Sequence, residues 1–273
     1  MCIRDSPFCS GIGPGDTRLT TRYDPHDFGD ALFSILHEAG HGLYDQGLDP
    51  WHYGTPMGDA VSLGIHESQS RLWENFVGRS RAFWEYWLPR ARQAFPEASV
   101  NASLDGFVFA VNEVRPSLIR VDADEATYNL HILLRFELEQ ALIGGDLSAA
   151  DLPAAWAEGM KRLLGIVPRD DARGCLQDIH WSGGGFGYFP TYTLGNLYAA
   201  QFFAKARAEL GDLDEQFRRG EFLPLRAWLT RKIHREGQRY RAADLVLAVT
   251  GEPLNPDYLL RHLREKFGAL YGV

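Results

Sequence analysis

The chain has 273 residues, of which 45% are hydrophobic and 12% are aromatic, and its formal net charge is -8. This length is enough to bury a sizeable core in one or two domains. Acidic and basic residues are interspersed, with no basic patch suited to nucleic acid and no apolar run of membrane-spanning length. We therefore expect neither nucleic acid nor a membrane as a partner.

Alternation with β-branched residues predicts a strand over residues 16–23. Apolar residues at the helical period predict a helix over residues 27–46. Asp27 is the expected N-cap of this helix, and Gly47 is its expected C-terminal stop.

An H-E-x-x-H motif lies within this helix, as His37-Glu38-Ala39-Gly40-His41. His37 and His41 are one helical turn apart on one face, so both imidazoles can meet one metal ion. Glu38 lies beside the first of them, where a metal-activated water needs a base. The motif is typical of metal-dependent hydrolases, most often peptidases.

A third ligand is needed, because a catalytic zinc site has three protein ligands and one open position. The metzincin continuation of the motif is absent. Glu67 is the best candidate, in His66-Glu67-Ser68-Gln69, which lies on a second predicted helix. Glu74 and Asp59 are weaker alternatives.

Two further polar residues lie near the predicted ligands. His66 is adjacent to Glu67 and so points roughly 100° away from it on a helix, which makes direct ligation of the same metal unfavourable. It either contacts a ligand or the substrate, or packs between helices. Asp45 lies on the same face as His41 and either accepts the second N–H of a ligand imidazole or is an ordinary exposed aspartate.

The rest of the chain is predicted to be mostly helical, which gives a mainly α fold with a small minor β-sheet. The helix over residues 60–95 is expected to be interrupted near residues 87–90. The next helix is expected to have Asn101 or Ser103 as its cap. Further helices are predicted at residues 103–117, after residue 125 to about residue 143 with Gly144 and Gly145 ending it, 151–165, after residue 192 to about residue 210, 222–236, 241–249 and 255–270.

The cysteines Cys2, Cys9 and Cys175 are scattered and include no C-x-x-C pair. This argues against a disulfide framework and a cysteine metal site, and a reducing cytoplasm is the simplest location. No apolar segment of the signal-peptide type is visible at the N-terminus. Residues 1–6 do not resemble the start of a domain, and we expect them to be a non-native scar.

Three other segments are dense in polar groups that could bind a chain terminus or stabilise developing negative charge. Arg18 lies on the predicted strand, close in sequence to the metal helix. Arg120 comes just before a helix. His180, Tyr188 and Tyr192 are expected on loops, where functional side chains are often found.

Taken together, the motifs resemble the M32 family of metallocarboxypeptidases, the carboxypeptidase Taq type, from about residue 7 to the C-terminus. The motifs that carry the resemblance are D-T-R-L-T at 16–20, H-E-A-G-H at 37–41, H-E-S-Q at 66–69, I-R-V-D-A-D-E at 119–125, and Q-D-I-H-W with G-Y-F-P-T-Y-T-L-G within 177–195.

The resemblance implies a zinc or cobalt enzyme that removes C-terminal residues of peptides one at a time, with broad side-chain tolerance and little action next to proline. It also implies a largely helical, zincin-like, saddle-shaped fold with a deep groove, and a homodimer. Family members are roughly twice as long as this chain. Residues 7–273 are therefore expected to be the C-terminal catalytic part, a single domain that lacks the N-terminal half.

The resemblance also implies roles for single residues. His37, His41 and Glu67 resemble the zinc ligands, and Glu38 resembles the general base. Arg18 resembles an arginine that closes the end of the groove.

The remaining implied roles each have an alternative. Arg120 resembles an arginine that binds the substrate carboxylate, although it could instead form a structural ion pair with Asp122 or Asp124. Tyr192, with Tyr188 and His180, resembles residues near the scissile carbonyl. Tyr192 could instead be a core aromatic residue, and His180 a loop-packing histidine.

The expected reaction is hydrolysis by metal-activated water, with Glu38 taking the proton and passing it to the leaving amine. Two alternatives stay open: another zinc peptidase, either an aminopeptidase or an endopeptidase, or an inactive metal-binding fragment.

Overall fold

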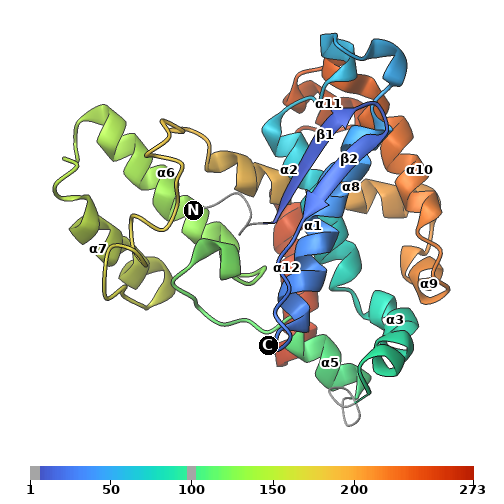
Figure 1. Ribbon diagram of the computed structural model, residues 1–273, viewed down its shortest axis with the longest axis horizontal. Helices are drawn as coiled ribbons and strands as arrows, with labels where there is room; N and C mark the ends of the chain where they lie inside the picture. The colour runs from blue at the N-terminus through green and yellow to red at the C-terminus, as the bar shows by residue number, and fades with distance from the viewer. Residues whose placement is uncertain (1–6, 97–102) are drawn as a thin grey trace. The chain divides into compact units, whose positions relative to one another are not determined.

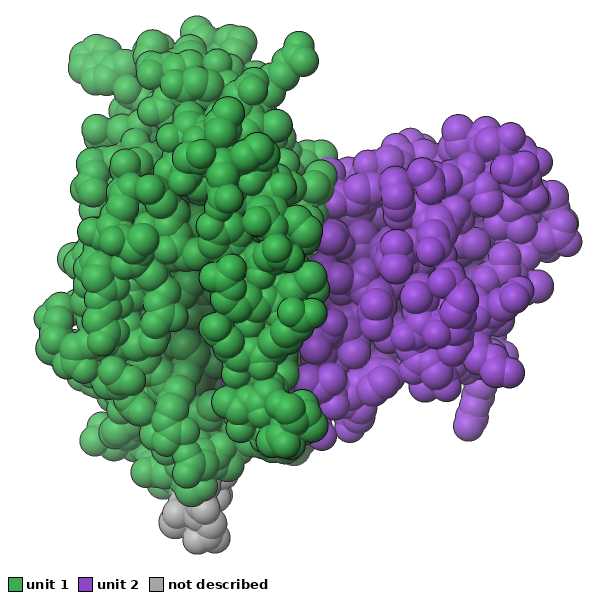
Figure 2. Space-filling model, turned by 180° about the vertical axis from the view of Figure 1, so that it is seen from behind, with its two compact units in different colours: residues 1–111, 194–273 green, residues 112–193 purple. Residues whose placement is uncertain are grey.

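The computed structural model describes residues 7–96 and 103–273, and it is mainly helical with one two-stranded sheet (Figure 1), as the sequence predicts. Residues 1–6 and Asn101 lie outside the described part. The chain divides into two compact units (Figure 2). The first unit comprises residues 1–111 and 194–273, and the second comprises residues 112–193. The expectation from the sequence was a single domain over residues 7–273.

The first unit begins with a β-hairpin that packs on helix α1. Strand β1 (Phe8–Gly13) runs antiparallel to β2 (Asp16–Thr20), which is the predicted strand, ending three residues earlier than expected. Strand β1 was missed, because its sequence FCSGIG has neither alternation nor a clear apolar face. Both strands contact α1.

Helix α1 (Phe28–Gly47) begins as predicted, because the Asp27 carboxylate accepts a hydrogen bond from the backbone N–H of Asp30 at 2.9 Å. The helix ends within one residue of the predicted position, but Gly47 does not act as its C-terminal stop. Gly47 is still helical, and Leu48 is the C-cap. A Cβ atom at Gly47 would lie 2.2 Å from Nδ1 of His234, so a glycine is required there by close packing.

The predicted helix over residues 60–95 is broken, but not near residues 87–90. Helix α2 (Leu63–Arg71) continues as a π-helix, η4 (Leu72–Gly78), and α3 (Arg81–Ala94) then starts at the Ser80 cap. Pro89 lies inside α3. The helix continues through it because Phe83, Trp84 and Leu88 bury its apolar face, and this burial outweighs the loss of one backbone hydrogen bond.

Helix α5 (Leu104–Ala110) is capped by the Ser103 hydroxyl as expected, but it ends well before residue 117. Pro116 disfavours a helix that continues to residue 117, because a proline disfavours the helical conformation of the residue before it. Helix α8 (Pro190–Leu210) begins in the second unit, to which residues 190–193 belong, and continues in the first unit. The first unit is completed by α9 (Leu213–Arg218), α10 (Leu223–Lys232), η6 (His234–Arg239), α11 (Ala242–Thr250) and α12 (Asp257–Tyr271). Helix α9 was not predicted from the sequence.

The second unit is built on α6 (Tyr128–Gly144) and α7 (Leu152–Leu164), preceded by the 3-10 turn η5 (Arg120–Asp122). Gly145 follows α6 in the left-handed conformation, at φ +82°, and ends the helix as predicted. The two helices meet at a buried apolar cluster that contains Leu134, Trp156 and Met160. No helix in either unit, over the described residues, is long and apolar enough to cross a membrane.

Candidate metal centre

The three predicted metal ligands meet in the first unit. Nε2 of His37 lies 3.8 Å from Oε2 of Glu67, and Nε2 of His41 lies 3.5 Å from the same oxygen. One donor atom from each of the three side chains lies within 4.8 Å of the other two. Zinc bonds of about 2.0–2.1 Å in a tetrahedral site separate neighbouring donors by about 3.3–3.4 Å. Two imidazoles and one carboxylate at these distances therefore fit a divalent metal with one position left for substrate or water.

The close approach of α1 and α2 brings the ligands together. Gly40, between the two histidines, faces the α2 backbone so closely that a Cβ atom there would lie 2.5 Å from the carbonyl oxygen of Gln69. Gly195 on α8 faces the other side of α2, where a Cβ atom would lie 2.4 Å from Cγ of Glu67. Neither glycine was singled out from the sequence, although Gly40 lies inside the motif.

The weaker ligand candidates are placed elsewhere. Glu74, on the π-helix, contacts the other ring nitrogen of His37, Nδ1, with its Oε2 at 2.9 Å. Arg71 donates to Glu67 at 2.8 Å and to Glu74 at 3.2 Å. Arg71 thus holds the predicted ligand and the carboxylate that orients His37 in one network. Asp59 is not part of the ligand group.

His66 connects Asp45 to the metal centre. Its Nδ1 lies 2.6 Å from Nδ1 of His41, and its Nε2 lies 2.9 Å from Oδ1 of Asp45. With Nε2 of His41 turned towards Glu67, its Nδ1–H is available to donate a hydrogen bond to Nδ1 of His66, whose Nε2–H in turn donates one to Asp45. His66 therefore contacts a predicted ligand, which is one of the two roles left open, and Asp45 is linked to His41 through it.

Burial and nearby charges shift the pKa values of the three predicted ligands. Burial would raise the pKa of Glu67, but Arg71 and His37 hold it below its ordinary value, so the carboxylate is ionised. Burial lowers the pKa of His41 and favours the neutral imidazole. Burial would also lower the pKa of His37, but Glu67 and Glu74 raise it. A metal ion would take the place of the proton that these carboxylates attract to His37.

Glu38 lies beside the ligand group, and its side chain is 8% exposed. Burial raises the pKa of this carboxyl above its ordinary value. Cys9 of β1 faces the same region, where burial, Asp45 and Glu38 raise the pKa of its thiol to about 12. The thiol is therefore protonated near neutral pH.

Arg18, the predicted groove arginine, lies on β2 in the first unit. Its side chain is exposed, and its Nε pairs with Oδ1 of Asp16 at 3.2 Å. This exposed pair contributes little to stability and leaves the guanidinium accessible.

The predicted substrate-binding residues other than Arg18 belong to the second unit. Arg120 is buried there and contacts Oδ1 of Asp178 through Nε at 3.1 Å and Nη2 at 2.7 Å, while Nη1 donates to the Tyr128 hydroxyl at 3.0 Å. Arg135 holds the other oxygen of Asp178 through Nε at 2.7 Å. The open alternative of an ion pair is thus realised, with Asp178 as the partner of Arg120.

His180 and Tyr192 are neighbours in this unit, with Nε2 of His180 lying 3.1 Å from the Tyr192 hydroxyl. The rings of His180 and Tyr188 have centroids 5.1 Å apart. Tyr192 is not on a loop as expected, because α8 already starts at Pro190. The guanidinium of Arg120 lies 4.7 Å from the centroid of the Tyr192 ring.

His131 gives the second unit a predicted sensitivity to acid. It is fully buried on α6, and neither ring nitrogen has a hydrogen-bond partner among the described residues. Burial, with Arg135 and Arg120 nearby, lowers its pKa from 6.5 to about 4. The folded state therefore binds its proton later than the unfolded state, so stability is lost as the pH falls from about 6.5 to 4, by on the order of 3 kcal/mol.

We expect His131→Leu to remove this loss. The test is the free energy of unfolding by denaturant at pH 7 and pH 4.5, for the parent and the variant. The free energy of unfolding of His131→Leu, relative to that of the parent, should be higher at pH 4.5 than at pH 7. The exposed His26→Leu change should keep the same free energy of unfolding relative to the parent at both pH values. An equal loss in the parent and in His131→Leu would contradict the assignment.

Comparisons place these features among known proteins. A family model described as Carboxypeptidase Taq (M32) metallopeptidase matches residues 4–267. The chain is 59% identical over 266 residues to thermostable carboxypeptidase 1 of Thermus thermophilus, covering 97% of this chain and 52% of that protein. It is 47% identical over 265 residues to carboxypeptidase 1 of Bacillus subtilis, covering 97% of this chain and 53% of that protein.

A solved structure has the same fold as this chain. The crystal structure of the M32 carboxypeptidase from Deinococcus radiodurans R1 matches with a TM-score of 0.96 and 47% identity, over 98% of this chain and 54% of that chain. The chain thus spans about half the length of the relatives it matches.

Proposed function

Because this chain belongs to the carboxypeptidase Taq (M32) metallopeptidase family, we propose that it hydrolyses the C-terminal peptide bond of peptides with the help of a bound metal ion. The observation that carries the proposal is the meeting of His37, His41 and Glu67, with Glu38 beside them. Zinc is the metal that this donor set suits best, and cobalt is a second candidate.

His37, His41 and Glu67 would hold the ion. When bound, the ion polarises a carbonyl group and makes a water molecule acidic enough to lose its proton near neutral pH. Glu38 accepts that proton and delivers it to the nitrogen of the leaving residue. The raised pKa of Glu38 brings this carboxyl closer to neutral pH, where a group that both accepts and donates a proton works best.

Further roles are proposed residue by residue from the family resemblance. Arg18 limits how far the substrate extends, and its exposed guanidinium suits that role. Arg120 recognises the substrate carboxylate, and since it already pairs with Asp178, it would share its N–H groups between the two. Tyr192, with His180 and Tyr188, supplies hydrogen bonds to the negative charge that develops on the carbonyl oxygen.

The remaining proposals concern the setting of the enzyme. We propose peptides of broad sequence as substrates, a homodimer as the assembly and the cytoplasm as the location. These rest on the family resemblance and on the cysteine usage.

A set of peptides with blocked ends tests the reaction. One peptide with a free C-terminal carboxylate and one with a C-terminal amide are incubated with the zinc-loaded chain, and the products are identified by mass spectrometry. We expect single residues to be released from the free acid, and the amide to be resistant. A chelator should stop the release, and added zinc or cobalt should restore it.

Each alternative gives a different result. Equal cleavage of the acid and the amide would contradict a carboxypeptidase and favour an endopeptidase. Loss of cleavage on N-acetylation alone would favour an aminopeptidase. Zinc bound in equimolar amount without turnover would favour a metal-binding fragment.

His66 is predicted to control how tightly the metal is held. Replacing His66 with alanine removes the group that orients His41, and we expect the dissociation constant for zinc to rise by about 10- to 100-fold. The measurement is a competition titration against a chromophoric chelator. His66→Asn should recover part of the affinity, because its amide oxygen can accept a hydrogen bond from the ring N–H of His41. The exposed His52→Ala change should have no effect, and unchanged affinity in His66→Ala would contradict the role.

A further inference from the structure

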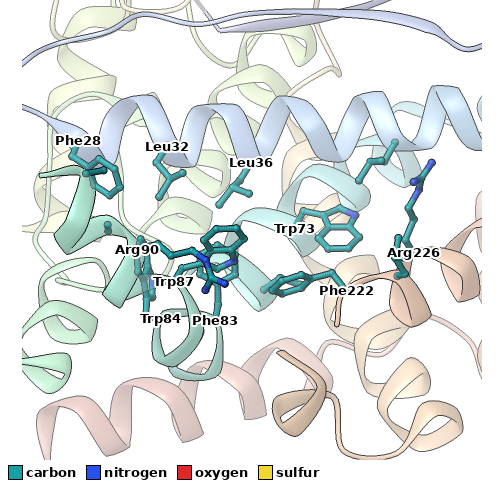
Figure 3. Close-up of a pocket in the computed structure, with 15 residues that line it drawn as sticks. Phe28, Leu32, Leu36, Trp73, Phe83, Trp84, Trp87, Arg90, Phe222 and Arg226 are labelled. Atoms are coloured by element: carbon teal, nitrogen blue, oxygen red, sulfur yellow. The ribbon is translucent and has the colours of Figure 1, made fainter. Parts of the chain in front are cut away.

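The large pocket of the first unit is apolar and does not suit a peptide carboxylate. Its volume is about 560 Å³, and it lies between α1, the π-helix, α3 and α10. Phe28, Leu32 and Leu36 point into it from α1 (Figure 3). Arg90, one of its two arginines, lies over the Trp87 ring, with Cζ 5.2 Å from the ring centroid. Recognition of a carboxylate needs charged donors held in a fixed place, and such donors are buried in the second unit.

The second unit buries two arginines around one carboxylate. Arg120 donates to Oδ1 of Asp178 through Nε at 3.1 Å and through Nη2 at 2.7 Å. Arg135 donates to the other oxygen, Oδ2, through Nε at 2.7 Å, and its Nη2 lies 2.6 Å from the same atom. Among the described residues, Asp178 is the one carboxylate that forms a salt bridge with either arginine. Two guanidinium groups therefore share a single counter-ion, and the three side chains form the arginine cluster.

The arginine cluster has more positive than negative charge. Burial would raise the pKa of Asp178, but Arg120 and Arg135 hold it below its ordinary value, so this carboxylate is ionised. Burial lowers the pKa of Arg135 to about 10, and its guanidinium is still protonated at neutral pH. Burial also lowers the pKa values of the nearby His131 and His180 below 6.5, so both imidazoles are neutral there. Two cations and one anion leave the cluster with a net charge of +1.

The two arginines differ in what they can contact. The side chain of Arg120 is 7% exposed, whereas that of Arg135 is 0% exposed, so an anion from outside can reach only Arg120. Arg120 uses three of its five N–H groups for Asp178 and Tyr128, which leaves two for a bound carboxylate. Glu139, one turn along α6 from Arg135, accepts its hydrogen bond from an indole N–H instead of pairing with the cluster. A buried excess charge is costly, and a bound anion would offset it.

We propose that Arg135 is a positioning residue for the substrate carboxylate, because it neutralises Asp178 and leaves the charge of Arg120 uncompensated. Without Arg135, Arg120 and Asp178 form a neutral pair, which attracts a second carboxylate only weakly. Arg135 also fixes the geometry. Its Nη2 donates at 2.8 Å to Oε1 of Gln177, the oxygen that accepts the backbone N–H of Arg120 at 2.9 Å. The inference rests on the proposed role of Arg120 in binding the substrate.

Peptide binding without hydrolysis tests the proposal. The zinc-loaded chain carries Glu38→Gln in every sample, so that the peptide is not consumed. An N-acetylated tripeptide is used in two forms, one with a free C-terminal carboxylate and one with a C-terminal amide. Isothermal titration calorimetry gives the two dissociation constants, well below the unfolding temperature of each variant. The constant for the amide divided by the constant for the acid is the acid preference, and it reports recognition of the carboxylate.

We expect Arg135→Gln to lower the acid preference by about tenfold, because one positive charge near the bound carboxylate is lost. Arg135→Lys keeps the charge and should retain most of the preference. Asp178→Asn raises the net charge of the cluster and should raise the preference. Combining Arg135→Gln with Asp178→Asn returns the net charge to that of the unchanged cluster, so it should restore the preference although it removes more buried contacts. Arg162→Gln removes an exposed charge from α7 of the same unit and should have no effect.

Three outcomes would overturn the proposal. They are an acid preference that Arg135→Gln leaves unchanged, equal losses in Arg135→Gln and Arg135→Lys, and a double variant whose preference is as low as that of Arg135→Gln. The last two would make the contacts of Arg135, and not its charge, responsible. Turnover enters none of these measurements. A chain that shows the expected order of acid preferences but releases no residue from a peptide would contradict the proposed reaction and leave this inference standing.

Discussion

Replacing Glu38 with glutamine is expected to lower peptide turnover by about 10²- to 10⁴-fold while the bound metal is retained. Glutamine has the shape of glutamate but cannot accept and return a proton. Glu38 lies outside the ligand group, so the change should leave the metal content as it is. The measurements are kcat on a peptide with a free carboxylate, and zinc content by mass spectrometry.

A matched change separates the loss of a base from general damage. Glu139 is also a buried glutamate, but it lies in the second unit and accepts a hydrogen bond from Nε1 of Trp181 at 2.8 Å. Glu139→Gln keeps a carbonyl oxygen for that contact and should retain turnover. Turnover of Glu38→Gln within threefold of the unchanged protein would contradict the role of Glu38.

The pH dependence offers a second test of the same residue. A general base must be deprotonated, and burial raises the pKa of Glu38 above the ordinary value of 4.5. Turnover should therefore fall as the pH drops and this carboxylate is protonated. The residual turnover of Glu38→Gln should lack this fall, since an amide does not titrate.

The ligand group could be predicted from the sequence because its geometry is local. Two histidines four residues apart on a helix face one way whatever surrounds them, and Asp27 fixes where that helix begins. Glu67 required one further inference, that a second short helix presents a carboxylate. That inference used the motif of residues 66–69 rather than any contact visible in the sequence.

The contacts between distant residues could not be predicted in this way. Arg120 pairs with Asp178, 58 positions away, whereas the sequence pointed to aspartates two and four positions away. Local spacing says nothing about such a partner, because the fold of the second unit brings it into place. The missed strand β1 is similar, since its sequence has no strand pattern and its pairing with β2 creates it.

The break in the helix at residues 60–95 illustrates a third limit. Proline is a strong local signal for the end of a helix, and the break was expected near residues 87–90, beside Pro89. The actual break falls at Ser80, whose hydroxyl accepts a hydrogen bond from the backbone N–H of Phe83 at 3.2 Å and starts α3. Packing of the aromatic face overrides the local signal, and the sequence does not show how strong that packing is.

Gly40 carries the second large prediction, because it sets the distance between the two ligand helices. We expect Gly40→Ala to weaken zinc binding at least 100-fold and to lower the stability of the chain. The added Cβ atom would lie 2.5 Å from both the carbonyl oxygen of Gln69 and Cα of Ser70. These are backbone atoms of α2, so no side-chain rotation relieves the clash, and the helices must separate by on the order of 1 Å.

That displacement acts on the ligands directly. His41 is the next residue along α1, and its Nε2 lies 3.5 Å from Glu67 on α2. Metal–ligand distances tolerate about 0.2 Å of error, so a shift several times larger opens the site. Overpacking of this kind costs about 1–3 kcal/mol of stability. This exceeds the gain of up to about 1 kcal/mol that alanine brings to a helix interior, so the net effect is destabilising.

Gly29→Ala on the same helix is the matched control. A Cβ atom there would lie 3.4 Å from its nearest neighbour, a side-chain oxygen of Asp27, which is an ordinary contact. The change adds the same methyl group to α1 without pushing α2, so zinc affinity should be unchanged and stability equal or slightly higher. Zinc affinity is measured well below the unfolding temperature of each variant, so that a loss reports the ligand geometry rather than unfolding. If Gly40→Ala and Gly29→Ala bound zinc equally well, the distance between α1 and α2 would not be what holds His41 against Glu67. The ligand set would then have to tolerate a separation that its short donor distances argue against.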